Sequence, residues 1–153
     1  MAKIDKSQYT KDEWKRIRND RRIQKSYDRN KKSIEQTVSN NPNIAFVLGN
    51  GTSRKSLNPD LLQKNGKVYG CNALYRSFRP NYLVAVDVKM VLEINKSGYQ
   101  HSNEVWTNPN KNFSRIQNLN YFSPSKGWSS GPTALWLASE HKYETIFILG
   151  FDY

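Results

Sequence analysis

The stretch IAFVLGNGTSRKSL, residues 44–57, decides the expected fold. Its five apolar residues, Ile44–Leu48, predict a strand that is buried on both faces, and a turn with two glycines follows them at once. The polar segment after the turn leads into a predicted helix. A buried strand that runs through a glycine turn toward a helix is typical of parallel α/β proteins, in which such turns lie at the carboxyl edge of the sheet.

The remaining elements alternate in the same manner. Predicted strands lie at Lys67–Gly70, Tyr82–Val86, Glu104–Thr107, Leu119–Phe122 and Thr145–Leu149, and predicted helices lie at Asn58–Gln63, Lys89–Asn95 and Thr133–Glu140. Continuous apolar strands separated by helices favour a parallel sheet that is covered on both faces. The expected fold class is therefore α/β, a Rossmann-like parallel sheet sandwich with an appended basic N-terminal helix.

The N-terminal part of the chain differs in composition from the rest. Lys11–Val38 contains no Pro or Gly and carries a narrow stripe of apolar residues at helical spacing, with Thr10 as a candidate N-cap. An Asn-rich break, Ser39–Asn43, ends this helix. We therefore expect two domains, a basic helical arm over residues 1–43 and a Rossmann-like domain over residues 44–153.

The charge balance points to polyanionic partners. The 153 residues carry 24 Lys and Arg against 13 Asp and Glu, a net charge of +11, and the pI is near 9.8. Nucleic acid, phosphorylated ligands and anionic surfaces all fit this balance. Six cations of the arm are predicted to contact nucleic acid or neighbouring subunits, with a solvated helix face as the alternative: Lys15, Arg18, Arg21, Arg22, Lys25 and Arg29.

The composition also excludes several classes of protein. With one cysteine, Cys71, and two histidines, the chain forms no internal disulfide, and we expect neither a metal site nor a cofactor. No apolar run approaches the roughly 20 residues that cross a bilayer, and no signal peptide is recognised at the start. We expect a protein of the cytoplasm, or of a virion if its source is a phage.

Polar residues follow several of the predicted strands and are expected to meet at the carboxyl edge of the sheet. The Gly-Asn-Gly turn departs from the dinucleotide fingerprint because its sixth position is Arg54, and it has no P-loop lysine, so a plain turn is the alternative. Asn72 and Asp87, which also follow predicted strands, can equally be helix N-caps. The candidate ligand-binding residues are Asn50, Gly51, Asn72, Asp87, Ser129, Ser130 and Gly131.

Three segments together resemble a known family. VLGNGTSRKSL, VYGCNALY and SSGPTALWLASEHKYETIFILGFDY look like the corresponding blocks of the family 42 bacterial sialyltransferases and of the related 6-hydroxymethylpterin pyrophosphokinase-like domains. The resemblance implies that Asn50 and Gly51 contact a nucleotide sugar and that Asn72 holds the nucleotide. It also implies that Ser130 and Gly131 line the donor pocket and that the donor is a cytidine sugar. The role of Asp87 carries over only loosely.

The catalytic part of that family has no counterpart in this sequence. In the sialyltransferases the histidine base and the phosphate-binding tyrosines follow the strand that matches Thr145–Leu149, whereas this sequence ends at Tyr153. His101 and His141 do not align with the base, and Gly127, next to Lys126, stands where the family has an arginine. No catalytic residue is assigned, and whether the chain is an enzyme is left open.

Aromatic residues are a further candidate group, because they can stack a base or a sugar. Core packing is the alternative, and general burial tendencies favour it. The residues concerned are Trp106, Tyr121, Phe122, Trp128 and Trp136.

Three functions of different classes follow from these observations. The first is a truncated sialyltransferase-like domain that acts as a nucleotide or nucleotide-sugar binding or assembly module without catalysis, and this one we rank highest. The second is a structural component of a phage virion or a similar particle, whose basic arm contacts nucleic acid or neighbouring subunits. The third is a small glycosyltransferase that uses a cytidine-sugar donor. We expect an oligomer or a part of an assembly.

Overall fold

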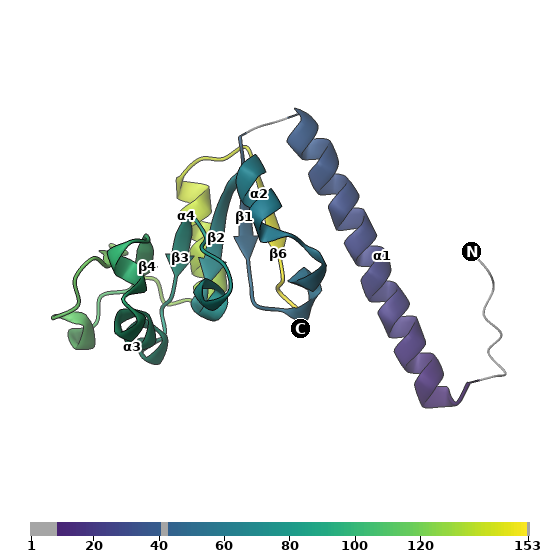
Figure 1. Ribbon diagram of the computed structural model, residues 1–153, viewed down its shortest axis with the longest axis horizontal. Helices are drawn as coiled ribbons and strands as arrows, with labels where there is room; N and C mark the ends of the chain where they lie inside the picture. The colour runs from purple at the N-terminus through teal and green to yellow at the C-terminus, as the bar shows by residue number, and fades with distance from the viewer. Residues whose placement is uncertain (1–8, 41–42, 153) are drawn as a thin grey trace. The chain divides into compact units, whose positions relative to one another are not determined.

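The structure is a computed structural model that describes residues 9–40 and 43–152. Its internal contacts divide the chain into two units, residues 1–37 and 38–153. Helix α1, Lys11–Asn40, makes up nearly all of the described part of the first unit, and the α/β domain makes up the second (Figure 1). The helix continues through Ser39 and Asn40, two residues beyond the predicted end at Val38, and Asn41 and Pro42 of the predicted break lie outside the described residues.

Six strands form one parallel sheet, which confirms the predicted Rossmann-like α/β fold (Figure 1). The strands are β1 (Ile44–Leu48), β2 (Lys67–Cys71), β3 (Tyr82–Val84), β4 (Val105–Thr107), β5 (Asn120–Tyr121) and β6 (Thr145–Leu149). Their order across the sheet is β5-β4-β3-β2-β1-β6, and every neighbouring pair is parallel. Five consecutive residue pairs join β1 to β6, so β1 is paired along its whole length.

Three α-helices and four short 3-10 helices connect the strands. The α-helices are α2 (Pro59–Asn65), α3 (Val88–Ser97) and α4 (Ser130–Glu140). The 3-10 helices are η2 (Thr52–Ser56), η3 (Asn72–Arg76), η4 (Tyr99–His101) and η5 (Lys111–Phe113). The structure differs from the sequence prediction mainly at β3, which ends two residues before Val86, and at α4, which begins at Ser130 rather than Thr133.

Two apolar clusters cover the two faces of the sheet. Ala45 and Val47 of β1 belong to the cluster that packs under α4, together with Ala134, Leu137 and Ala138. A second cluster gathers around α3 from β3, β4 and η5. Because α4 contacts β1, β2, β3 and β6, its position is fixed across the middle of the sheet. The continuous apolar run of β1 therefore reflects a strand with no solvent-facing side.

The order in which the chain adds strands to the parallel sheet reverses at β1. From β1 the chain adds β2, β3, β4 and β5 in succession on one side, and α4 then carries it back to place β6 on the other side of β1. The segments that follow β1 and β6 therefore start at neighbouring strand ends. In open parallel sheets, ligands bind outside the carboxyl ends of the strands at such a reversal.

The start of α1 is fixed by local contacts. The Thr10 side chain accepts a hydrogen bond from the Glu13 backbone N–H at 3.3 Å, and the Glu13 carboxylate accepts one from the Thr10 backbone N–H at 2.8 Å. This reciprocal pair is a capping box, and it confirms Thr10 as the N-cap. The rings of Tyr9 and Trp14, one on each side of the cap, lie 6.4 Å apart and fix the angle at which the chain enters the helix.

No helix in the part of the chain that the structure describes is both long and apolar enough to cross a membrane.

Candidate functional site at the carboxyl edge of the sheet

The loop after β1 is tied to the end of β2 by the side chain of Asn50. The Asn50 amide Nδ2 donates a hydrogen bond to the backbone carbonyl of Cys71 at 2.8 Å. Cys71 is buried, and burial raises the pKa of its thiol to about 12, so the thiol is neutral and serves as a packing group. Asn50 therefore holds two adjacent strand ends together at the sheet edge.

Asn72 and Ser130 form the centre of the site. Asn72 begins η3 with φ at 51°, a left-handed conformation that non-glycine residues adopt at some cost and asparagine tolerates best. Its Oδ1 accepts a hydrogen bond from the Ser130 hydroxyl at 2.7 Å, and the Ser130 Oγ accepts one from the Val86 backbone N–H at 3.1 Å. Ser130 is 3% exposed, so this link joins the ends of β2 and β3 to the start of α4 inside the fold.

The first turn of α4 leaves backbone donors at the same edge. Ser129 is the N-cap, but its side chain makes no capping hydrogen bond. Thr133 donates both its backbone N–H and its hydroxyl to the Ser129 carbonyl, and Pro132 has no N–H. Among the residues that the structure describes, the N–H groups of Ser130 and Gly131 and the Asn72 Nδ2 have no hydrogen-bond acceptor. Three unused donors thus lie around the N-terminus of one helix, where an anion is favoured.

Backbone N–H groups of the glycine turn after β1 are bonded within the fold. The Gly51 N–H donates to the Gly150 carbonyl at 2.7 Å, and the Ser53 N–H donates to Asp152 Oδ2 at 2.7 Å. The Thr52 hydroxyl donates to the same carboxylate oxygen at 3.1 Å. Hydrogen bonds from Ser53 lower the pKa of Asp152. The anion in this turn is therefore the chain's own carboxylate.

The close approach of the loops after β1 and β6 explains the glycines of the turn. A Cβ added at Gly51 would lie 2.6 Å from both the Gly150 carbonyl oxygen and the Asp152 Cγ, and one at Gly49 would also overlap the Gly150 carbonyl. The ring of Phe151 lies against Gly131 at the start of α4 and would overlap a Cβ there too. Residues 150–152 therefore pack against both the turn and the helix start.

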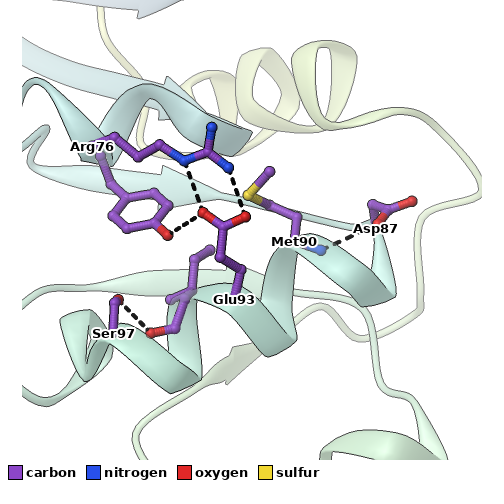
Figure 2. A network of polar contacts seen from close by, with 7 residues as sticks. Arg76, Asp87, Met90, Glu93 and Ser97 are labelled. Carbon is purple, nitrogen blue, oxygen red and sulfur yellow. Dashed lines mark hydrogen bonds and ion pairs between the residues drawn. The ribbon is translucent and has the colours of Figure 1, made fainter.

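Asp87 lies at the same edge of the sheet but is engaged by its own helix. Its Oδ1 accepts a hydrogen bond from the Met90 backbone N–H at 3.2 Å, which makes Asp87 the N-cap of α3 (Figure 2). This geometry corresponds to the helix-capping alternative. Figure 2 also shows the Arg76–Glu93 ion pair beside this helix, which the sequence analysis did not single out.

Neither histidine lies at the site. His141 follows the last residue of α4, about 16 Å along the helix from Ser130, and bonds the buried Tyr69 hydroxyl. His101 bonds the Asn118 amide. Lys126 comes closest to the arginine of the family pattern, and its ammonium lies 3.8 Å from the centre of the Trp136 ring. No group of three His, Cys, Asp or Glu residues suited to a metal ion occurs within residues 9–40 and 43–152.

The aromatic candidates separate into packed and exposed residues. Trp106, Phe122 and Trp136 pack against one another, with ring centres 5.3 Å and 5.9 Å apart across Phe122, and they belong to the cluster under α4. Tyr121 and Trp128 are exposed. The Asn108 side chain holds the loop before α4 by bonding both backbone polar groups of Lys126, at 2.6 Å and 2.8 Å. Trp128 is therefore presented on a braced loop next to Ser129.

The structure brings together Asn50, Asn72, Ser130 and Gly131, as the sequence analysis expected of the carboxyl edge. It adds Asp152, which lies just beyond a predicted strand and within the last segment of the family resemblance but was not among the candidate ligand-binding residues.

Comparisons of this chain with protein-family models, with curated proteins and with solved structures find no match.

Proposed function

We propose that the chain binds the phosphate-bearing part of a nucleotide or nucleotide sugar at the carboxyl edge of its sheet and acts as a binding module without glycosyl transfer. The observation that carries the proposal is the set of three unused donors at the start of α4, namely Asn72 Nδ2 and the N–H groups of Ser130 and Gly131. A helix N-terminus with free N–H groups favours negative charge. The resemblance to the sialyltransferase family supports a cytidine nucleotide as the first ligand to test.

The conformation of Asn72 is a second support. A left-handed asparagine is kept at a position where glycine would be less strained, and its side chain is directed to Ser130 at the site. Backbone strain of this kind is concentrated at functional sites. The amide oxygen is used within the fold, which leaves the amide nitrogen for a ligand oxygen.

The absence of a base near these donors supports binding over transfer. Glycosyl transfer needs a general base within hydrogen-bond reach of the acceptor hydroxyl. In the described part of the chain, both histidines are bonded away from the helix start, and Asp87 and Asp152 are engaged in a helix cap and a loop. The glycosyltransferase alternative predicts turnover of a cytidine-sugar donor by purified protein, which we do not expect above background.

The test compares two asparagines of equal backbone geometry. Asn72→Gly removes the amide and suits the left-handed backbone, so the variant should fold. Asn118→Gly does the same at φ 61°, away from the helix start. In calorimetric titrations with CMP, we expect Asn72→Gly to weaken binding by about 10-fold to 100-fold, the effect of losing a hydrogen bond to a charged group. Asn118→Gly should bind as the unaltered chain does.

Equal binding by both variants would contradict the site, and no binding of CMP or other nucleotides to the unaltered chain would contradict the function.

A second candidate function is that of a structural component of a phage virion or a similar particle. The protein would then be found in the cytoplasm before assembly and in the particle afterwards. The exposed cations of α1 favour it, including the six residues predicted from the sequence, because a charged helical arm can bind nucleic acid or a neighbouring subunit. Co-sedimentation of the chain with particles from its source, compared with a variant that lacks residues 1–40, tests this candidate.

A further inference from the structure

Seven cations of α1 recur at alternating spacings of four and three residues. They are Lys11, Lys15, Arg18, Arg22, Lys25, Arg29 and Lys32, and all seven side chains are exposed. At about 3.6 residues per turn, this spacing confines the seven residues to about 100° of the helix circumference. We call this set the cationic row. Five of the six arm residues predicted from the sequence belong to it, and Arg21 lies at its border.

The acidic residues of the helix do not neutralise the cationic row. The five acidic positions of α1, residues Asp12, Glu13, Asp20, Asp28 and Glu35, all fall outside its part of the circumference. Glu13 is engaged in the capping box, and Asp28 accepts a hydrogen bond from Gln24 at 3.1 Å. Within the described residues of α1, no ion pair joins a cation of the row to an acidic side chain. The charge on this face is therefore uncompensated.

The helix presents the row as a straight line. Residues 11–40 form one uninterrupted α-helix, and its first turn is fixed by the Thr10–Glu13 capping box and the Tyr9–Trp14 contact. The row runs over 21 residues, which is about 32 Å at 1.5 Å per residue. A duplex of this length carries about 19 phosphates, and B-DNA completes one turn in about 34 Å.

We propose that the cationic row binds the phosphate backbone of a nucleic-acid duplex without reading its sequence. This inference deepens the second candidate function by naming the partner of α1, and it rests on α1 alone. The contacts are charge to phosphate, so affinity falls with salt as counterions are released. Contacts to phosphate carry no sequence information, so we expect the same affinity for duplexes of different sequence.

Single strands and membranes fit the row less well than a duplex. Proteins that bind single strands stack bases on aromatic side chains, whereas the row contains none, and Trp14 at its border contacts Tyr9. A helix that lies in a membrane surface needs a broad apolar face. The side of α1 opposite the row carries the exposed Arg16 and Asp20, which interrupt such a face.

The decisive variant moves charge out of the row without changing the composition. Exchanging Arg18 with Asn19 and Gln24 with Lys25 (Arg18→Asn, Asn19→Arg, Gln24→Lys, Lys25→Gln) keeps the net charge of +11. All four side chains are exposed, so the fold should not change. The full chain and this exchanged variant are titrated with a 20-base-pair duplex of mixed sequence at several salt concentrations.

For the unaltered chain we expect a plot of log Kd against log salt concentration to rise with a slope of about 6. Each of the seven cations that contacts a phosphate contributes about 0.9 to this slope. The exchanged variant should bind about 10-fold to 100-fold more weakly at 0.1 M salt, with a slope of about 4.5. Equal affinity of the two proteins would overturn the proposal, because it would show that net charge, and not the position of the cations in the row, determines the affinity for the duplex.

Two further titrations decide the class of the partner. Tighter binding to a 20-nucleotide single strand than to the duplex would overturn the proposal, as would binding to anionic phosphatidylserine vesicles without duplex binding. Duplex binding with no co-sedimentation with particles would retain the inference and remove the assembly function. CMP titrations of the exchanged variant should match those of the unaltered chain.

Discussion

The carboxylate of Asp152 accepts a hydrogen bond from the backbone N–H of Ser53 at 2.7 Å, although 99 residues separate the two in the sequence. This bond joins the loop after β6 to the turn after β1 at the point where the order of the sheet reverses. The Thr52 hydroxyl bonds the same oxygen. The turn that looks like a site for an external phosphate is therefore occupied by an internal anion, and the unused donors lie one strand away, at the start of α4.

Asp152→Ala should lower the free energy of unfolding by about 0.5–1 kcal/mol at pH 7, less than the roughly 1.5–3 kcal/mol of hydrogen bonds to charged groups, because Asp152 is exposed. Urea unfolding monitored by tryptophan fluorescence measures the difference. A variant as stable as the unaltered chain would show that the Ser53 bond contributes nothing in water.

The stability difference between the unaltered chain and Asp152→Ala should depend on pH, and the lowered pKa of Asp152 gives the direction of this dependence. Hydrogen bonds from Ser53 hold the pKa of Asp152 below its ordinary 3.8, so the folded state favours the ionised carboxylate. The stabilisation is therefore fully present above about pH 4 and is lost as the pH falls through the lowered pKa. We expect the stability difference between the unaltered chain and Asp152→Ala to narrow in urea titrations taken from pH 7 toward pH 3. A difference that grows on acidification would contradict this sign.

Gly51→Ala should destabilise the domain by about 1–3 kcal/mol, the usual cost of forcing an extra methyl group into a packed site. Its Cβ would lie 2.6 Å from the Gly150 carbonyl oxygen, and backbone atoms cannot easily move away. Gly127→Ala is the matched control, because nothing lies within 4 Å of a Cβ there. Thermal unfolding by circular dichroism compares them, and equal melting temperatures would show that the two loops separate easily.

Ser130→Ala should cost about 1–3 kcal/mol in the free energy of unfolding. Its buried hydroxyl joins Asn72 to Val86, and removing it leaves the Val86 N–H without an acceptor inside the fold. Ser129→Ala is the adjacent control, because the Ser129 side chain makes no capping bond and is exposed. The difference between their urea midpoints is the measurement, and a larger loss from Ser129→Ala would contradict the assigned roles.

Glu93→Gln should leave the free energy of unfolding almost unchanged. Glu93 binds Arg76 through two hydrogen bonds, at 2.8 Å and 2.6 Å, but both side chains are substantially exposed (Figure 2). Exposed ion pairs stabilise little, and salt screens them. Urea unfolding at low and high salt should show that any small difference disappears at high salt, and a shift of the urea midpoint as large as that of Ser130→Ala would refute this ranking.

The sequence predicts several strands well because each is a short, largely apolar run, whether the strand is buried throughout like β1 or partly exposed like β6. The bounds of β1 and β6 match the predicted Ile44–Leu48 and Thr145–Leu149. The shortest strands are less well bounded, since β5 has only two residues and its pairing with β4 depends on the rest of the sheet. The same limit applies to β3, where the apolar run continues past the last paired residue into the loop before Asp87.

The candidate site was predicted in part, and the reason is physical. Asn50, Asn72 and Ser130 each follow a strand or begin a helix, and parallel topology alone brings such residues to one edge. The sequence does not show which hydrogen-bond donors at this edge are already bonded within the fold. Asp152 reaches the glycine turn only through the pairing of β1 with β6, and the left-handed φ of Asn72 is set by the turn into η3. Whether a nucleotide occupies the unused donors stays a prediction.

The buried thiol of Cys71 at the end of β2 can serve as an intrinsic probe of local unfolding. Cys71 is the only cysteine of the chain, and its neutral, enclosed sulfur should react with alkylating reagents only when the edge of the sheet opens. Under native conditions at mildly alkaline pH, the rate at which label accumulates at Cys71 then reports how often the end of β2 separates from Asn50 and from Ser130 at the start of α4. A bound ligand that bridges those ends would slow the labelling without touching the sulfur.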